Sequence, residues 1–266
     1  MKRLTTKIFL ALFLTRAVAG NSSAEKMISL MGDPCSLPLA EKLVEAYSAG
    51  NKEFKVEMTT VGCMMGVYNA ANEQADIGVS TQNGLSSNLP RGAVNTVIAK
   101  APIVLVVNKA NPVNNLTYKQ LQGIYDGKIT NWKELGGADI EIENVMLEPC
   151  VRYTMSKKVI SYDKDISKLA PGKKVNPVTH TNVMVELNKG AIGQQLYGYE
   201  TDEVKVLSID GIFPSEDTVP DKYTFYEEYN VVTSKEPASS IKKFIQFTKS
   251  AEGKKIISAM KHIPVS

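Results

Sequence analysis

Three cysteines are the residues of this chain with the most distinctive chemistry. Cys35, Cys63 and Cys150 each lie in a short loop directly before an expected helix. Such loops in α/β proteins commonly hold small ligands, because free N–H groups and the positive end of the helix dipole meet there. An odd number of cysteines leaves at least one thiol without an intramolecular disulfide partner. The sequence therefore suggests a site for a ligand that binds sulfur; the plainer alternative is one disulfide plus a buried cysteine.

The segments around the cysteines alternate between β-rich runs and helical patterns, as βαβ units require. Helices are expected at 38–49, 67–74, 118–125, 152–162, 182–188 and 239–250, and from about 253. Strands are expected at 54–60, 76–80, 103–108, 142–147, 204–209 and 223–233. The run 103–108 is continuously apolar, which is typical of a strand buried on both faces. This pattern predicts an α/β fold, with the segments near 101–108 and 223–233 as candidate crossings between two lobes.

The first 19 residues have the pattern of an export signal. A basic start precedes a short apolar run at 8–14, and an A-x-A cleavage pattern follows at 17–19. The chain holds 31 Lys and Arg against 28 Asp and Glu, and four of the basic residues lie in 1–19, so the remainder has a net charge of −1. We expect a soluble periplasmic protein, and its charge gives no basic stripe for nucleic acid.

One motif in the chain is long enough to indicate a relationship to known proteins. Residues 116–137 read LTYKQLQGIYDGKITNWKELGG, and the shorter patterns at 75–78, 190–193 and 244–256 follow in a consistent order. This arrangement resembles the phosphate-binding-protein family, the periplasmic receptors of phosphate ABC transporters and their relatives. The resemblance implies two α/β lobes, each a mostly parallel sheet flanked by helices, joined by two hinge strands and enclosing the ligand. Lobe I would comprise 26–102 with 226–266, and lobe II would comprise 103–225.

The family holds an oxyanion with three loops rich in Ser, Thr and Gly, together with an Arg. On alignment, Cys35 falls on a Thr of the first loop and Cys63 on a Ser of the second, where Met64 stands in place of a Gly. Cys150 lies near a Ser of the third loop. The Arg that usually precedes that loop is absent, and Arg152 could substitute for it from the helix start.

Two further residues complete the expected site. Ser36 supplies a hydroxyl beside the first cysteine, and Asp76 is a carboxylate that could accept a proton from the ligand, although it could equally be structural. A thiol is a weak donor, and a helix amino terminus lowers its pKa. Thiolates, the missing Arg and the added carboxylates of Asp33 and Glu148 would all weaken phosphate binding.

Three converging thiolates would suit arsenite, an uncharged oxoacid whose arsenic bonds to sulfur. Cu(I) is the second candidate, because it prefers thiolate and thioether ligands, and zinc with a fourth carboxylate or His ligand is a third. The leading hypothesis is thus a binding protein that captures As(III) or Cu(I) for a membrane transporter or a sensor kinase. The alternative is an ordinary phosphate or other oxyanion receptor with incidental cysteines.

An enzyme is not expected. A cysteine nucleophile needs a nearby base, and nothing in the spacing of His180 recommends it for that role. His262 is expected at the surface, and no Ser-His-Asp pattern, P-loop or dinucleotide fingerprint occurs. The sequence predicts a monomeric binding protein for a small inorganic ligand.

Overall fold

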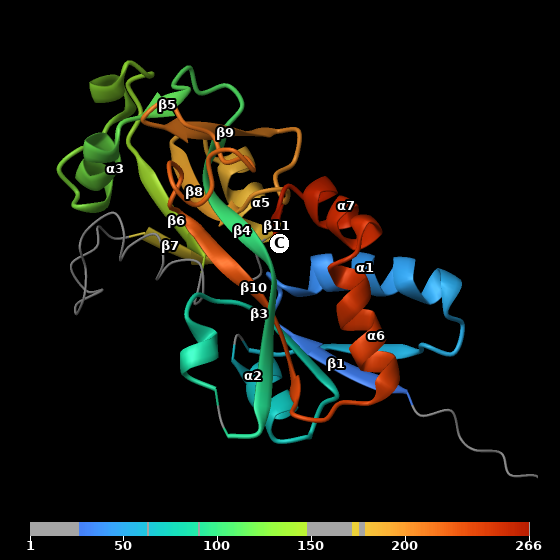
Figure 1. Cartoon of the computed structure of the whole chain (residues 1–266). Coiled ribbons are helices and arrows are strands. Elements are labelled where there is room, and N and C mark those ends of the chain that lie inside the picture. Colours follow the sequence, from blue (N-terminus) through green and yellow to red (C-terminus); the bar gives the residue numbers. More distant parts are fainter. Residues whose placement is uncertain (1–26, 63, 90, 148–171, 176–178, 266) are drawn as a thin grey trace, which may run out of the picture.

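The computed structural model describes residues 27–62, 64–89, 91–147, 172–175 and 179–265 (Figure 1). Their strands join in one curled sheet with the order β2-β1-β3-β10-β4-β8-β6-β7; β9 and β11 also pair with β4, and β5 pairs with β9. Helices pack against both halves of this sheet (Figure 1). The fold class predicted from the sequence, an α/β protein with two lobes, is confirmed.

The first half of the sheet contains the strand that leads into the first cysteine loop. In this half β1 pairs in parallel with β2 and β3, while β10 pairs antiparallel with both β3 and β4. The strand bounds are Ile28–Gly32 for β1, Val56–Thr60 for β2, Ile77–Thr81 for β3, Tyr226–Ser234 for β10 and Ala93–Asn108 for β4. The short strand β11, Ile263–Pro264, returns the carboxyl-terminal segment to β4.

The second half is built on the other end of β4. From Ile103 onward β4 pairs antiparallel with β8 and β9, whereas up to Pro102 it pairs with β10. Parallel pairs then join β6 to β7 and to β8, and β5 to β9. The bounds are Asn115–Leu116 for β5, Glu143–Leu147 for β6, Gly172–Val175 for β7, Ala191–Leu196 for β8 and Val204–Ile209 for β9.

Helix α1 covers the sheet with the face that its apolar spacing predicts. In α1 the buried residues Leu39, Leu43 and Tyr47 recur every four positions, so one stripe faces the core. The bounds are Leu37–Gly50 for α1, Met65–Ala71 for α2, Tyr118–Tyr125 for α3, Thr179–Leu187 for α5, Ser239–Thr248 for α6 and Ala251–Ala259 for α7. Single turns of 3-10 helix occupy Leu85–Ser87 and Trp132–Leu135. No helix in the described part of the chain has the length and apolarity needed to span a bilayer.

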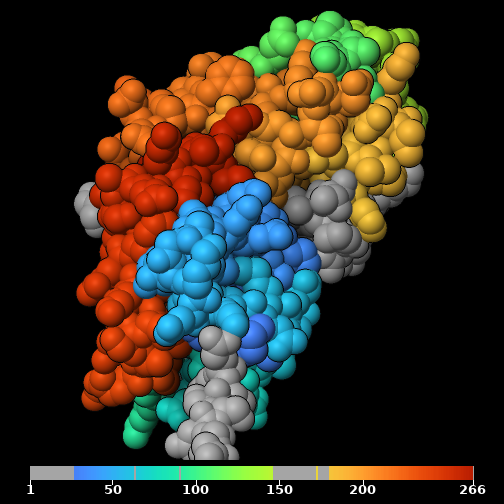
Figure 2. All heavy atoms as spheres, turned by 90° about the vertical axis from the view of Figure 1, so that its right-hand side faces the viewer, coloured from blue at the N-terminus to red at the C-terminus, as the bar shows by residue number. Residues whose placement is uncertain are grey.

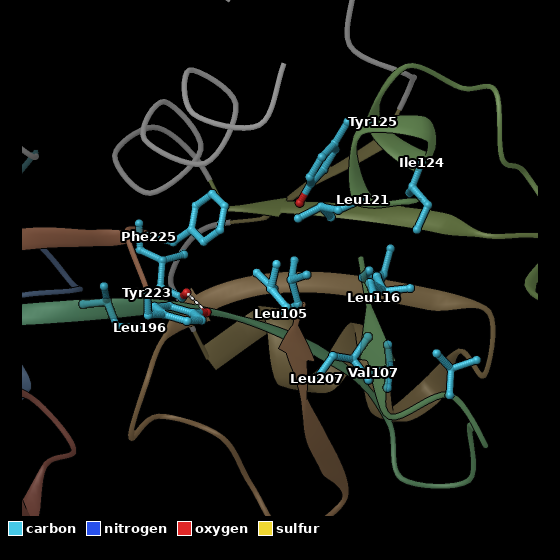
Figure 3. Packing of buried hydrophobic residues seen from close by; sticks show 14 of the residues in the cluster. Leu105, Val107, Leu116, Leu121, Ile124, Tyr125, Leu196, Leu207, Tyr223 and Phe225 are labelled. Carbon is cyan, nitrogen blue, oxygen red and sulfur yellow. Dashed lines mark hydrogen bonds between the residues drawn. The ribbon is translucent and has the colours of Figure 1, made fainter. Parts of the chain in front are cut away.

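Two large hydrophobic clusters form the cores of the two halves. The first joins α1, α6 and α7 to β1, β3 and β10. The second joins α3 to β4, β8 and β9, and Figure 3 shows Leu121 and Tyr125 of α3 pointing toward Leu105 of β4. The Tyr223 hydroxyl donates to the Ile103 carbonyl at 2.7 Å within this second core (Figure 3).

Two expectations about the sheet need correction. The sheet is mixed rather than mostly parallel, because β10 and β4 run antiparallel to their neighbours. The strand expected at 103–108 is the end of a 16-residue strand. The change of partner on β4 between residues 102 and 103 lies at the predicted lobe boundary, and the division at 102/103 and 225/226 stays a prediction.

Candidate functional site

The loop 33–36, here called the first loop, connects β1 to α1. Its conformation is held by hydrogen bonds to the side chain of Asp33. One carboxylate oxygen of Asp33, Oδ1, accepts hydrogen bonds from the backbone N–H groups of Cys35 at 2.9 Å and Ser36 at 3.0 Å. Pro34 has no N–H to donate. Two of the amides that could attract an anion at this helix start are therefore already bound to a carboxylate of the chain.

Asp33 is a fully buried carboxyl group. Burial raises its pKa above the ordinary value, while hydrogen bonds from the backbone of Cys35 and Ser36 and from the side chains of Ser36 and Ser80 oppose the rise. Its second oxygen, Oδ2, has no hydrogen-bond partner among the described residues. Buried polar atoms are normally hydrogen-bonded, so Oδ2 stands out as an acceptor with unused capacity.

Ser36 holds the first loop against the sheet. Its hydroxyl lies 3.1 Å from the Asp33 carbonyl and 3.2 Å from the Val79 carbonyl of β3, and it accepts the Asp33 N–H at 3.1 Å. The side chain is fully buried. These contacts are all with the protein itself, so they give Ser36 a structural role in the loop.

The thiol of Cys35 differs from the expected thiolate. Cys35 is 5% exposed and belongs to the hydrophobic cluster of the second half of the sheet. Burial raises its pKa, and the negative charges of Asp33 and Glu227 raise it further. The expectation that the helix amino terminus would make this cysteine partly thiolate at neutral pH is wrong, because loss of solvation and nearby carboxylates outweigh the helix dipole.

Three of the predicted ligand residues, Cys63, Cys150 and Arg152, lie outside the described residues. Their convergence with Cys35 therefore stays a prediction. Within the described ranges, no three His, Cys, Asp or Glu side chains group so as to hold a metal ion.

The other two predicted site residues, Met64 and Asp76, lie in different surroundings. Met64 is partly buried and packs with Val67 and its neighbours in a small apolar cluster under α2. Asp76 precedes β3, and its Oδ2 accepts the Ser29 N–H at 2.9 Å and contacts the Ser29 hydroxyl at 3.0 Å. This contact joins the starts of β1 and β3, at the opposite end of these strands from the first loop. The structure thus favours the structural alternative for Asp76.

The two histidines of the chain differ in their exposure to solvent. His180 is exposed on α5, as expected for a solvated residue. His262 is 1% exposed, so the expectation of a surface position is wrong. Its Nδ1 lies 2.7 Å from the Met260 carbonyl, and the rings of Tyr199 and Tyr229 cover it with centroids at 5.9 and 6.4 Å. Burial lowers the pKa of His262 to about 4, so the imidazole is neutral at neutral pH.

Two tyrosines that were not expected at the site, Tyr199 and Tyr229, bind carbonyls of the first loop. Tyr199 follows β8, and its hydroxyl donates to the Cys35 carbonyl at 2.8 Å. It lies 164 positions from Cys35, and no sequence pattern of the region around it points to that contact. Thr81, at the end of β3 beside the first loop, has a buried hydroxyl with no partner among the described residues.

This two-lobed α/β fold, with a loop between β1 and α1, is one that the chain shares with solute-binding proteins. The chain belongs to the PBP superfamily, whose domain pattern matches residues 17–252. A relative named phosphate-binding protein PstS, from Borreliella burgdorferi, is 23% identical over 97% of this chain and 96% of its own length. The prediction that the chain is a binding protein rather than an enzyme is confirmed by such relatives.

The chain is also similar to solved structures. A protein from Clostridium perfringens, named as a phosphate ABC transporter substrate-binding protein and solved with bound phosphate, is 29% identical, with a TM-score of 0.81. The alignment covers 91% of this chain and all of that one. A phosphate transport receptor from Vibrio cholerae is also 29% identical, with a TM-score of 0.70 over 89% of this chain and 99% of its own.

Proposed function

We propose that this protein is an exported receptor that binds phosphate, or a similar oxoacid that keeps a proton, and delivers it to an ABC transporter in the membrane. The observation that carries the proposal is the likeness in sequence and fold, over nine-tenths of the chain, to a protein solved with phosphate. The pattern of an export signal at 1–19 supports a place outside the cytoplasm.

Asp33 narrows the class of ligand. Its carboxylate occupies two amides of the first loop, and its free Oδ2 is a buried acceptor. Sulfate has no proton to donate at neutral pH and would meet repulsion at this oxygen, whereas phosphate retains a P–OH group. We therefore expect phosphate to bind and sulfate to be rejected.

Arsenite and Cu(I) remain a second candidate class because of the cysteines predicted at all three ligand loops. The protonated thiol of Cys35, packed in an apolar cluster, counts against coordination by three thiolates. Arsenite could still bind as an oxoacid, since its As–OH groups can donate to Asp33. A sensor role in place of transport, and the monomeric state, likewise stay predictions.

Titration calorimetry on reduced, metal-free protein tests the proposal. Phosphate, sulfate, arsenite and Cu(I) are compared on the natural sequence and on Cys35→Ser. We expect phosphate binding that Cys35→Ser changes by no more than about threefold, because the Cys35 side chain packs in the apolar cluster of the second half of the sheet. Failure of phosphate to bind, or arsenite binding that disappears in Cys35→Ser, would sink the proposal in favour of a thiolate site.

A further inference from the structure

The turn 197–200, here called the β8 turn, links the first loop to the second half of the sheet. The Tyr199 hydroxyl donates to the Cys35 carbonyl at 2.8 Å. On its other side, the Tyr199 carbonyl accepts a hydrogen bond from the Asn182 side chain of α5 at 2.6 Å. A single residue therefore connects the loop after β1 to a helix that packs on β8.

The carboxyl-terminal segment holds the β8 turn in place. Lys261 forms an ion pair with Glu200, and its ammonium group lies 4.6 Å from the centre of the Tyr197 ring. Gly198 has a φ of +98°, and a Cβ there would lie 2.2 Å from the Met260 carbonyl oxygen, so only glycine fits. Figure 2 shows this carboxyl-terminal segment lying between α1 and the segments near residue 200.

A second tyrosine provides a comparison within the same loop. Tyr229 of β10 donates its hydroxyl to the carbonyl of Ser36, next to the carbonyl that Tyr199 binds. Tyr229 belongs to the half of the sheet that carries the first loop, whereas Tyr199 follows a strand of the other half. Burial raises the pKa of both phenols, so both hydroxyls keep the proton that they donate.

We propose that Tyr199 is a positioning residue that fixes the first loop relative to the second half of the molecule and thereby sets ligand affinity. The Tyr199 hydroxyl bridges the two halves, and the ring packed on His262 fixes its direction. The effect on affinity rests on the proposed function, but the effect on the arrangement of the two halves does not. No phosphate oxygen needs to touch Tyr199 for this role.

The test compares Tyr199→Phe with Tyr229→Phe in the full chain. Each variant loses one hydroxyl that donates to a carbonyl of the first loop, but only Tyr199→Phe removes a contact between the halves. Small-angle scattering of the ligand-free protein measures the radius of gyration, and calorimetry measures phosphate affinity. We expect Tyr199→Phe to enlarge the radius of gyration and to weaken phosphate binding about two- to tenfold, the range of one net hydrogen bond.

Tyr229→Phe is the control, and its radius of gyration should differ from that of Tyr199→Phe. Tyr229→Phe should leave the radius of gyration unchanged, even where it lowers the melting temperature as much as Tyr199→Phe does. An unchanged radius of gyration in Tyr199→Phe, or equal changes in both variants, overturns the inference. If the natural sequence does not bind phosphate, the proposed function fails while the scattering comparison still decides the role of Tyr199.

Discussion

Among single residues, Asp33 has the largest effect on the chemistry of the first loop. Its Oδ1 holds the amides at the start of α1, and its buried Oδ2 lacks a partner among the described residues. Because its pKa is raised, the carboxyl loses its proton at a higher pH than an ordinary aspartate, and only the ionised Oδ2 accepts a hydrogen from phosphate and repels sulfate. The preference for phosphate over sulfate should therefore increase as the pH rises through the pKa of Asp33.

Replacing Asp33 with Asn tests this electrostatic role. The amide oxygen can still accept the two N–H groups, but the negative charge is gone. We expect Asp33→Asn to reduce the preference for phosphate over sulfate about tenfold at pH 8, equivalent to about 1.4 kcal/mol, because an amide at the Oδ2 position neither accepts the P–OH hydrogen nor repels sulfate. The change should shrink at pH 5. Calorimetry with both anions at both pH values measures it, and an unchanged ratio of the two affinities at pH 8 would show that Asp33 does not select the ligand.

His262 gives a prediction for stability. Its folded pKa of about 4 lies below the ordinary 6.5, so the unfolded chain binds more protons between these values. The free energy of unfolding should therefore fall by up to about 3 kcal/mol as the pH drops from 6.5 to 4. Denaturant unfolding at several pH values, compared with His262→Gln, isolates this contribution. Parallel curves for the two proteins would contradict the burial of a neutral imidazole.

Among the secondary-structure elements, α2 owes its position to close packing against β1 and β3. A Cβ at Gly66 would lie 2.4 Å from the Met31 carbonyl oxygen, and one at Gly78 would lie 2.3 Å from the Gly66 carbonyl oxygen. These glycines let α2 lie directly on β1 and β3. The loop that precedes α2 is thereby fixed beside the first loop, since both follow neighbouring parallel strands.

Gly66→Ala should therefore push α2 away from β1. We expect a loss of about 1–3 kcal/mol in stability, together with weaker phosphate binding as the preceding loop moves. The matched control is Gly50→Ala at the end of α1, where a Cβ meets nothing within 4 Å. That change should leave stability and affinity nearly unaltered. Denaturant unfolding measures the stability of both variants, and calorimetry measures their phosphate affinity. Equal values for the two variants would show that α2 tolerates displacement.

The elements themselves were largely predictable from apolar spacing and helix signals. The expected helix at 118–125 agrees with α3 at Tyr118–Tyr125, where Thr117 and Gln120 form a reciprocal cap. The strands β1 and β8 and the amino-terminal half of β4 were not expected. In that half of β4, apolar residues are interrupted by polar ones, so no continuous apolar run indicates a strand. The burial of Cys35 and His262 could not be predicted, since it depends on Tyr199 and other residues distant in sequence.

The whole molecule shares one strand between its two halves. β4 pairs with β10 along its first part and with β8 and β9 along its last, so the halves have a common backbone element. A ligand held between the halves should therefore stabilise both together. At free phosphate 100 times the dissociation constant, we expect about 2.7 kcal/mol of added stability.

For a chain of this length that gain corresponds to a rise of about 5–10 °C in melting temperature. Differential scanning calorimetry with phosphate, and with sulfate at the same concentration, makes the comparison. Sulfate is the control because it stabilises proteins generally by exclusion from their surface. We expect phosphate to raise the melting temperature well beyond the sulfate value, with both halves unfolding in one shifted transition. Equal shifts with the two anions would contradict specific binding. A split transition in which only one part moves would show that the ligand contacts one half alone, because only contacts to both halves raise their stability together.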